Sequence, residues 1–144
     1  MFRLTLFLMT FCGGIAATIQ PSVNARLAQK IGVIESACVS FAVGTIVLLI
    51  IALSGGGSFK GLYDAEWWEL TGGFLGAFFV VITTLVVPRI GTTGTMVLII
   101  AAQLIVGMLM DHFGLFGFRG VAIDLKRLAG VGLLGAGIVL ILKS

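Results

Sequence analysis

The chain has few of the residues on which soluble domains and enzymes depend. Only 10% of its 144 residues are charged, and it has one histidine, two prolines and two cysteines. A soluble domain carries about 25% charged residues, so this composition argues against a water-facing surface. The histidine, His112, lies far in sequence from Cys12 and Cys38, without metal-ligand spacing. Because no Ser-His-Asp set or phosphate loop is legible, we expect neither enzyme activity nor a metal or cofactor.

Hydrophobic residues and glycine are abundant, in contrast to the few charged residues. Hydrophobic residues make up 59% of the chain, 21 residues are glycine, and the mean hydropathy is +1.21. Glycine is more frequent in membrane helices than in soluble ones. The apolar run from Leu4 to Phe11, after Arg3, imitates a signal peptide. We interpret it as the first membrane helix, because the rest of the chain is equally hydrophobic.

Five apolar segments are candidates to cross a bilayer. A hydrocarbon core of about 30 Å needs roughly 20 helical residues. Runs this long and uniform favour helices over barrel strands, since lipid leaves backbone groups no other partner. The sequence therefore predicts an all-α membrane protein with a single five-helix transmembrane domain over residues 1–144. The expected helices span residues 4–28, 36–53, 68–87, 94–110 and 127–142, with a tight turn at 88–91 and a longer loop at 114–126.

Basic residues are almost evenly divided between the two sides of this topology. Cytoplasmic loops normally hold the excess of Lys and Arg, so a difference of one charge barely specifies an orientation. We predict that the chain inserts both ways up and pairs as an antiparallel homodimer, which recreates the inverted repeats of many transporters. A single orientation is the alternative. The two sides carry Arg3, Lys60, Arg119, Lys126 and Arg127 on one, and Arg26, Lys30, Arg89 and Lys143 on the other.

The first expected helix has a stripe that is small at one end and polar at the other. Helical spacing aligns Gly13, Ala17, Gln20 and Asn24 on one face. Pro21 cannot bond to the carbonyl of Ala17, which favours a bend. Gln20 and Asn24 therefore become candidate substrate contacts, with a tolerated kink and interhelical hydrogen bonds as the alternative.

The fourth expected helix holds an amide near the middle of an apolar run. Gln103 shares a face with Gly107 and Asp111. An amide at the bilayer midplane must find a partner or face water, so we predict that Gln103 contacts a substrate. An interhelical hydrogen bond is the alternative. Ser40, on the second expected helix, completes the candidate substrate-binding set.

Small residues mark the faces expected to pack against other helices. Gly72 and Gly76 form a GxxxG pair, which lets two backbones approach closely. Gly132 and Ala136 form a similar stripe on the fifth expected helix. We predict helix packing at both pairs, with the second pair a candidate for the dimer interface.

Four stretches in order resemble a known family. They are QPSVNARL at residues 20–27, SFAVGT at 40–45, GGFLGAFF at 72–79, and QL at 103–104 followed by DHFG at 111–114. Together they resemble the YdcZ-like family of short bacterial inner-membrane proteins, in the drug/metabolite transporter superfamily. The resemblance implies five helices per subunit, an antiparallel pair, multi-pass insertion in the bacterial inner membrane and alternating access.

The resemblance names no substrate. The related small multidrug resistance proteins use a membrane-embedded Glu in their first helix, whereas residues 4–28 here contain neither Glu nor Asp. We therefore expect a small dual-topology transporter of an unidentified solute rather than a proton-driven exporter of cationic drugs. A dual-topology ion channel and a non-transporting scaffold or accessory subunit are the alternatives. The expected partners are the lipid bilayer, the solute and a second copy of the chain, with no nucleic acid.

Overall fold

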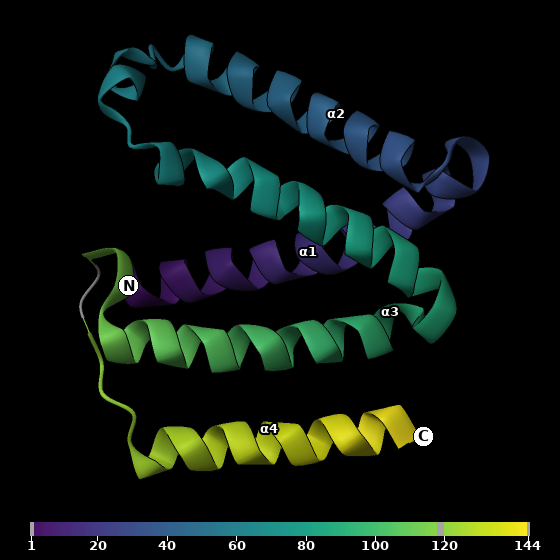
Figure 1. Ribbon diagram of the computed structural model, residues 1–144, viewed down its shortest axis with the longest axis vertical. Helices are drawn as coiled ribbons and strands as arrows, with labels where there is room; N and C mark the ends of the chain where they lie inside the picture. The colour runs from purple at the N-terminus through teal and green to yellow at the C-terminus, as the bar shows by residue number, and fades with distance from the viewer. Residues whose placement is uncertain (1, 118–119, 144) are drawn as a thin grey trace. The chain divides into compact units, whose positions relative to one another are not determined.

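The computed structural model describes residues 2–117 and 120–143 of the chain (Figure 1). The described residues form helices and loops without a strand, which confirms the all-α prediction. The long helices are α1 (Phe2–Ile31), α2 (Val33–Ser54), α3 (Gly72–Phe113) and α4 (Leu125–Lys143). Short 3-10 helices in the connections are η1 (Lys60–Asp64), η2 (Trp67–Thr71) and η3 (Leu115–Gly117).

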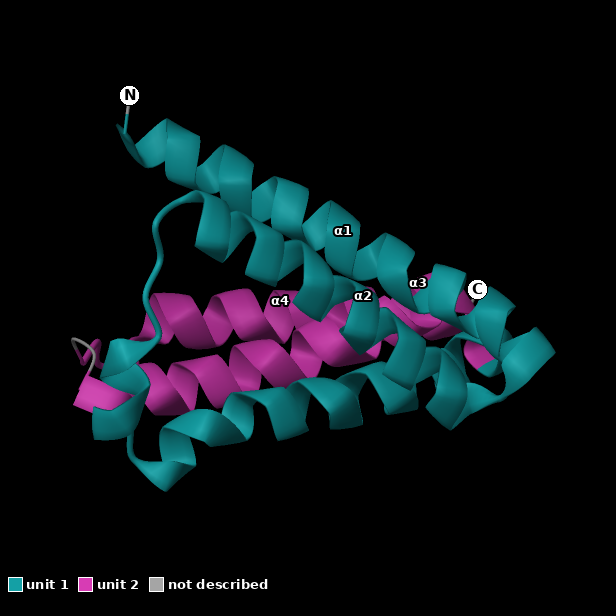
Figure 2. Cartoon of the chain, turned by 90° about the horizontal axis from the view of Figure 1, so that it is seen from above, with its two compact units in different colours: residues 1–89 teal, residues 90–144 magenta. Residues whose placement is uncertain are grey.

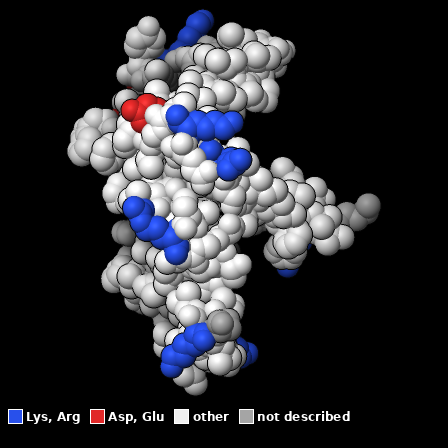
Figure 3. All heavy atoms as spheres, turned by 90° about the vertical axis from the view of Figure 1, so that its right-hand side faces the viewer, with Lys and Arg blue, Asp and Glu red and all other residues white. Residues whose placement is uncertain are grey.

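The long helices expose apolar side chains and bury small or polar ones. Four of the described helices are long and apolar enough to cross a membrane. Phe74 and Leu133 are 75% and 76% exposed, whereas Ser36 is fully buried. Charged side chains are sparse on the face drawn in Figure 3, where wide uncharged areas separate them. This distribution is the reverse of a soluble protein and suits a chain whose surroundings are hydrocarbon.

The chain divides into two compact units, residues 1–89 and residues 90–144 (Figure 2). Unit 1 contains α1, α2 and the first part of α3. Unit 2 contains the remainder of α3 and α4.

Gly32 alone separates α1 from α2. Its φ of 102° lies where only glycine is comfortable, and an added Cβ would collide with the carboxylate of Glu35. The first hydrogen bond of α2 runs from the Ser36 N–H to the Gly32 carbonyl at 3.1 Å. The tight junction brings the end of α1 beside the start of α2, and the two helices pack together.

The buried centre of unit 1 is small and partly polar. Its apolar members are Ala25, Ala37, Val80 and Val87, together with the ring of Pro21. The Ser36 hydroxyl donates to the Asn24 carbonyl at 2.8 Å and ties α2 to α1. The remaining buried polar residues of this unit are Asn24, Thr83 and Thr84.

Helix α3 is interrupted at Gly91. Helix α3 extends from Gly72 to Phe113, but Gly91 within it has φ 78° and ψ 163°, far from helical geometry. The expected turn at residues 88–91 therefore differs in detail: Pro88 lies inside the helix, and the break is at Gly91 alone. The Thr95 hydroxyl donates to the Gly91 carbonyl at 2.8 Å and supplies a local partner just after the break.

One of the basic residues used to predict the orientation is not described by the structure. Arg119, in the loop before α4, is outside the described residues. The predicted balance of basic residues between two membrane faces therefore stays a prediction.

Candidate functional site

A groove of about 420 Å³ runs along unit 2 between α3 and α4. Its walls are mostly apolar, with one amide partway along and an ion pair at the end near the loop. The α3 side supplies Gln103, Leu104, Gly107, Met108 and Asp111, and the α4 side supplies Arg127, Gly130, Val131 and Leu134.

Local sequence explains why these side chains line one groove. Gln103, Gly107 and Asp111 recur at intervals of four residues, so they lie on one face of α3. Gly107 and Gly130 have no side chains to fill the space between the helices. An added Cβ at either would meet nothing within 4 Å among the described residues. Glycine on both helices therefore leaves open space in the groove.

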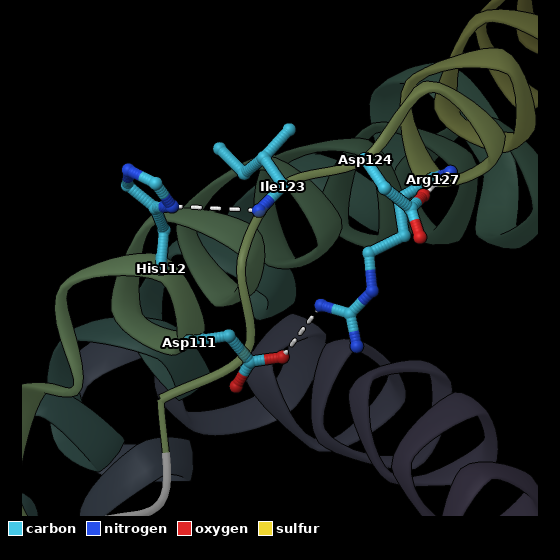
Figure 4. Close-up of polar contacts among 5 residues, drawn as sticks. All are labelled: Asp111, His112, Ile123, Asp124 and Arg127. Atoms are coloured by element: carbon cyan, nitrogen blue, oxygen red, sulfur yellow. Dashed lines mark hydrogen bonds and ion pairs between the residues drawn. The ribbon is translucent and has the colours of Figure 1, made fainter.

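The polar end of the groove is held by bonds from the end of α3 to the loop before α4 and to the first turn of α4 (Figure 4). The Nη1 atom of Arg127 lies 3.2 Å from the Oδ2 atom of Asp111. The Asp111 carbonyl accepts from the Val121 N–H at 2.8 Å, and His112 Nδ1 accepts from the Ile123 N–H at 3.4 Å. The Asp124 carboxylate accepts from the Arg127 N–H at 2.7 Å and caps α4.

This arrangement can bind a solute but offers no evident reaction. An amide donates and accepts hydrogen bonds, and the apolar walls suit an uncharged part of a ligand. The Asp111–Arg127 pair is partly exposed, with side chains 52% and 35% accessible. It is therefore worth only about 0.2–1 kcal/mol and can open at little cost. Among the described residues there is no group of three His, Cys, Asp or Glu suited to a metal.

The other residues predicted to bind substrate lie in unit 1. Asn24 is buried, with its Nδ2 unpaired among the described residues, while Ser40 is half-buried and Gln20 is exposed. Pro21 is fully buried, and α1 continues through it from Phe2 to Ile31. The structure thus places Gln103 in a groove and the other three on α1 and α2, and their role in binding stays a prediction.

The predicted packing residues have different surroundings. A Cβ added at Gly76 would lie 3.2 Å from the Phe41 ring of α2, so this glycine permits a close helix contact. Added Cβ atoms at Gly72 and Gly132 would meet nothing within 4 Å in the described chain. Ala136 is exposed as well. Neither glycine is therefore closely packed within its own unit.

A second groove, of about 320 Å³, lies in unit 1 and was not anticipated from the sequence. It occurs where α1 ends, α2 begins and α3 passes them. Thr84 is 1% exposed, and its Oγ1 has no hydrogen-bond partner within residues 2–117 and 120–143. The lining residues are Ala25, Ala28, Gln29, Val33, Thr84, Leu85, Pro88 and Arg89.

Parts of both grooves could not be predicted from the sequence, because they depend on contacts between residues far apart in the chain. Arg127 and Met108 line the first groove, but pairing Arg127 with Asp111 requires knowing how the loop between them folds. Thr84 carried one readable signal: Pro88, four residues later, lacks the N–H that would bond the Thr84 carbonyl.

Comparison with known proteins gives a family. Residues 5–140 match the family model described as "Putative inner membrane exporter, YdcZ". The chain is also 30% identical over 121 residues to "Inner membrane protein YdcZ" of Escherichia coli (strain K12), covering 81% of this chain and 78% of that protein. No solved structure matches the chain. The matched span includes every long helix described above almost in full, and the chain belongs to the YdcZ family of inner membrane proteins.

Proposed function

We propose that the chain is a membrane transporter of a small solute that works by alternating access in an antiparallel homodimer. The observation that carries this proposal is the unit 2 groove, where Gln103 stands between apolar walls beside the Asp111–Arg127 pair. A family described as an inner membrane exporter supports the same function. The expected location is the bacterial inner membrane, crossed several times.

The number of crossings in this proposal is five. Helix α3 has 42 residues, which corresponds to about 63 Å at 1.5 Å per residue. This is about twice the 30 Å of a hydrocarbon core, so one crossing would leave half of an apolar helix in water. The interruption at Gly91 divides α3 into two parts of about 20 residues, each long enough to cross.

In this proposal, a second copy of the chain packs against α4 and completes the transport path. The α4 face with Gly132 and Ala136 is open within unit 2, and small residues are typical of helix interfaces in membranes. The near-equal division of basic residues supports insertion in both orientations. Two opposed copies would then form an inverted repeat around a shared path.

Gln103 is the proposed central solute contact, and Gln20, Asn24 and Ser40 are proposed to join it in the assembled transporter. The Asn24 Nδ2 is a buried donor whose partner is absent from the described part of the chain, which supports its assignment to a ligand. Pro21 frees a carbonyl one turn earlier in α1 and can supply a further acceptor.

Solute flux in liposomes tests the transport proposal. Purified protein should give saturable flux of at least one solute from a panel chosen by thermal stabilisation, because a ligand that prefers the folded state raises its stability. Gln103→Leu should abolish flux and leave the dimer intact. Ala102→Leu, which adds bulk at the neighbouring exposed position, is the matched control and should transport normally. Normal flux in Gln103→Leu would remove Gln103 from the site.

The rate of flux and the topology separate this proposal from its rivals. Flux too fast for a conformational cycle would indicate a channel, and a stable foreign partner without solute binding would indicate an accessory subunit. Reporters fused at the C-terminus should be active on both sides of the membrane. Activity on one side only would contradict dual insertion and therefore the antiparallel homodimer.

A further inference from the structure

One residue that lines the unit 1 groove has a buried polar group that no described residue satisfies. Thr84 is one of the residues that line this groove; it is 1% exposed, and its Oγ1 is buried without a partner in the described chain. Buried polar atoms are almost always hydrogen-bonded, so an exception calls for an explanation such as a ligand. The neighbouring Thr83 shows the usual arrangement, because its hydroxyl donates to the Phe79 and Val80 carbonyls of its own helix at 2.9 and 3.1 Å.

Two groups that can bind an anion meet at the same groove, the start of α2 and the side chain of Arg89. Val33, one of its lining residues, is the first residue of α2, and no side chain among the described residues caps that helix start. The first N–H groups of a helix lack intrahelical partners and favour anions. Arg89 lines the groove from α3, and its guanidinium carries five N–H donors, one of which bonds to the Leu85 carbonyl.

The remaining polar lining also presents donors. The Gln29 Oε1 accepts from Arg26 Nη1 at 3.1 Å, and the Gln29 amide nitrogen is a donor that can serve a ligand. The groove is lined by one cation, and none of its described lining residues is acidic. Glu35 stands beside it: its carboxylate folds back against Gly32, at the same helix start.

We infer that this groove binds the phosphate of an anionic membrane phospholipid. The phosphate accepts hydrogen bonds from Thr84, Arg89 and the start of α2. The apolar lining of Ala25, Ala28, Leu85 and Pro88 accommodates the adjoining part of the lipid. The position favours a lipid over a free anion, because the groove lies where one apolar helix ends and the next begins, and the ends of membrane-spanning helices are expected near lipid headgroups.

Lipid binding to the purified full chain tests this inference without any measurement of transport. Native mass spectrometry from maltoside micelles would give dissociation constants for phosphatidylglycerol and for phosphatidylcholine. Phosphatidylglycerol should bind at least about fivefold more tightly, and Arg89→Gln and Thr84→Val should each weaken it about fivefold. Thr83→Val and Lys60→Gln are the matched controls and should bind as the unmodified chain does.

Removing the negative charge of Glu35 should change the affinity for phosphatidylglycerol in the opposite direction. Glu35→Gln deletes the competing carboxylate at the start of α2 and should tighten phosphatidylglycerol binding. Equal affinity for the two lipids, or unchanged binding in both Thr84→Val and Arg89→Gln, would overturn the inference. Inorganic phosphate binding as tightly as phosphatidylglycerol would overturn the assignment to a lipid. Because the readout is lipid affinity, these outcomes are independent of the transport proposal.

Discussion

Adjacent threonines on α3 should respond in opposite ways to the same substitution. Thr83 and Thr84 are both buried, at 2% and 1% exposure, and valine replaces either hydroxyl with a methyl group of similar size. Thr83 loses a hydroxyl whose single proton is shared between the carbonyls of Phe79 and Val80, while Thr84 loses a hydroxyl that has no partner among the described residues. The two variants therefore isolate the hydrogen-bonding state of the hydroxyl from its burial.

The expected magnitudes follow from the two environments. A buried hydroxyl without a partner costs about 1–3 kcal/mol, so Thr84→Val should raise the free energy of unfolding by about 1 kcal/mol or more. A satisfied hydroxyl contributes about 0.5–1.5 kcal/mol, and hydrogen bonds within membranes average near the low end at about 0.6 kcal/mol. Thr83→Val should therefore lower the free energy of unfolding by about that amount.

Thermal unfolding in an uncharged maltoside detergent without added lipid measures the difference. For a chain of this length, 1 kcal/mol corresponds to a shift in Tm of about 3 °C, so the two variants should differ by about 5 °C. A Tm for Thr84→Val at or below that of Thr83→Val would refute the reasoning, since it would show that the Thr84 hydroxyl has a partner in the free protein. Added phosphatidylglycerol should then stabilise Thr83→Val more than Thr84→Val.

Other predictions concern the break, the ion pair and the open helix face. Gly91→Ala should lower the free energy of unfolding by about 1–3 kcal/mol in the same assay, because only glycine tolerates φ 78° and ψ 163°. Gly13→Ala in α1 is the control and should not lower it. Equal effects of the two substitutions would show that the strain is not at Gly91. A double-mutant cycle with Asp111→Asn and Arg127→Gln should give a coupling of about 0.2–1 kcal/mol, and zero coupling would show that the pair contributes nothing to stability. Gly132→Leu should abolish the dimer in light scattering, with the helical content kept; a persistent dimer would exclude this face.

Part of the unit 2 groove is readable from spacing along one helix. Gln103, Gly107 and Asp111 recur every fourth residue, and all three line the groove. Their shared face is a local property of an α-helix. Arg127 belongs to the same groove, but its approach to Asp111 depends on a loop whose path local rules do not determine.

The unit 1 groove shows the same limit more strongly. Its lining comes from three helices, and its polar centre, Thr84, looks like an ordinary threonine beside Thr83 in the sequence. Whether a helical hydroxyl bonds to its own helix or faces a groove depends on its rotamer and on the helices packed around it. Those contacts join residues far apart in the sequence.

The sequence by itself determined the solvent and the secondary structure of this protein. A chain that is 59% hydrophobic and 10% charged must place apolar side chains in lipid, and lipid requires backbone groups to bond within helices. Tertiary structure alone decided which sparse polar groups meet: Ser36 with Asn24, Arg127 with Asp111, and Thr84 with no partner among the described residues. The physical reason is range, because helix formation follows from neighbours within four residues, whereas these pairings depend on how separate helices pack.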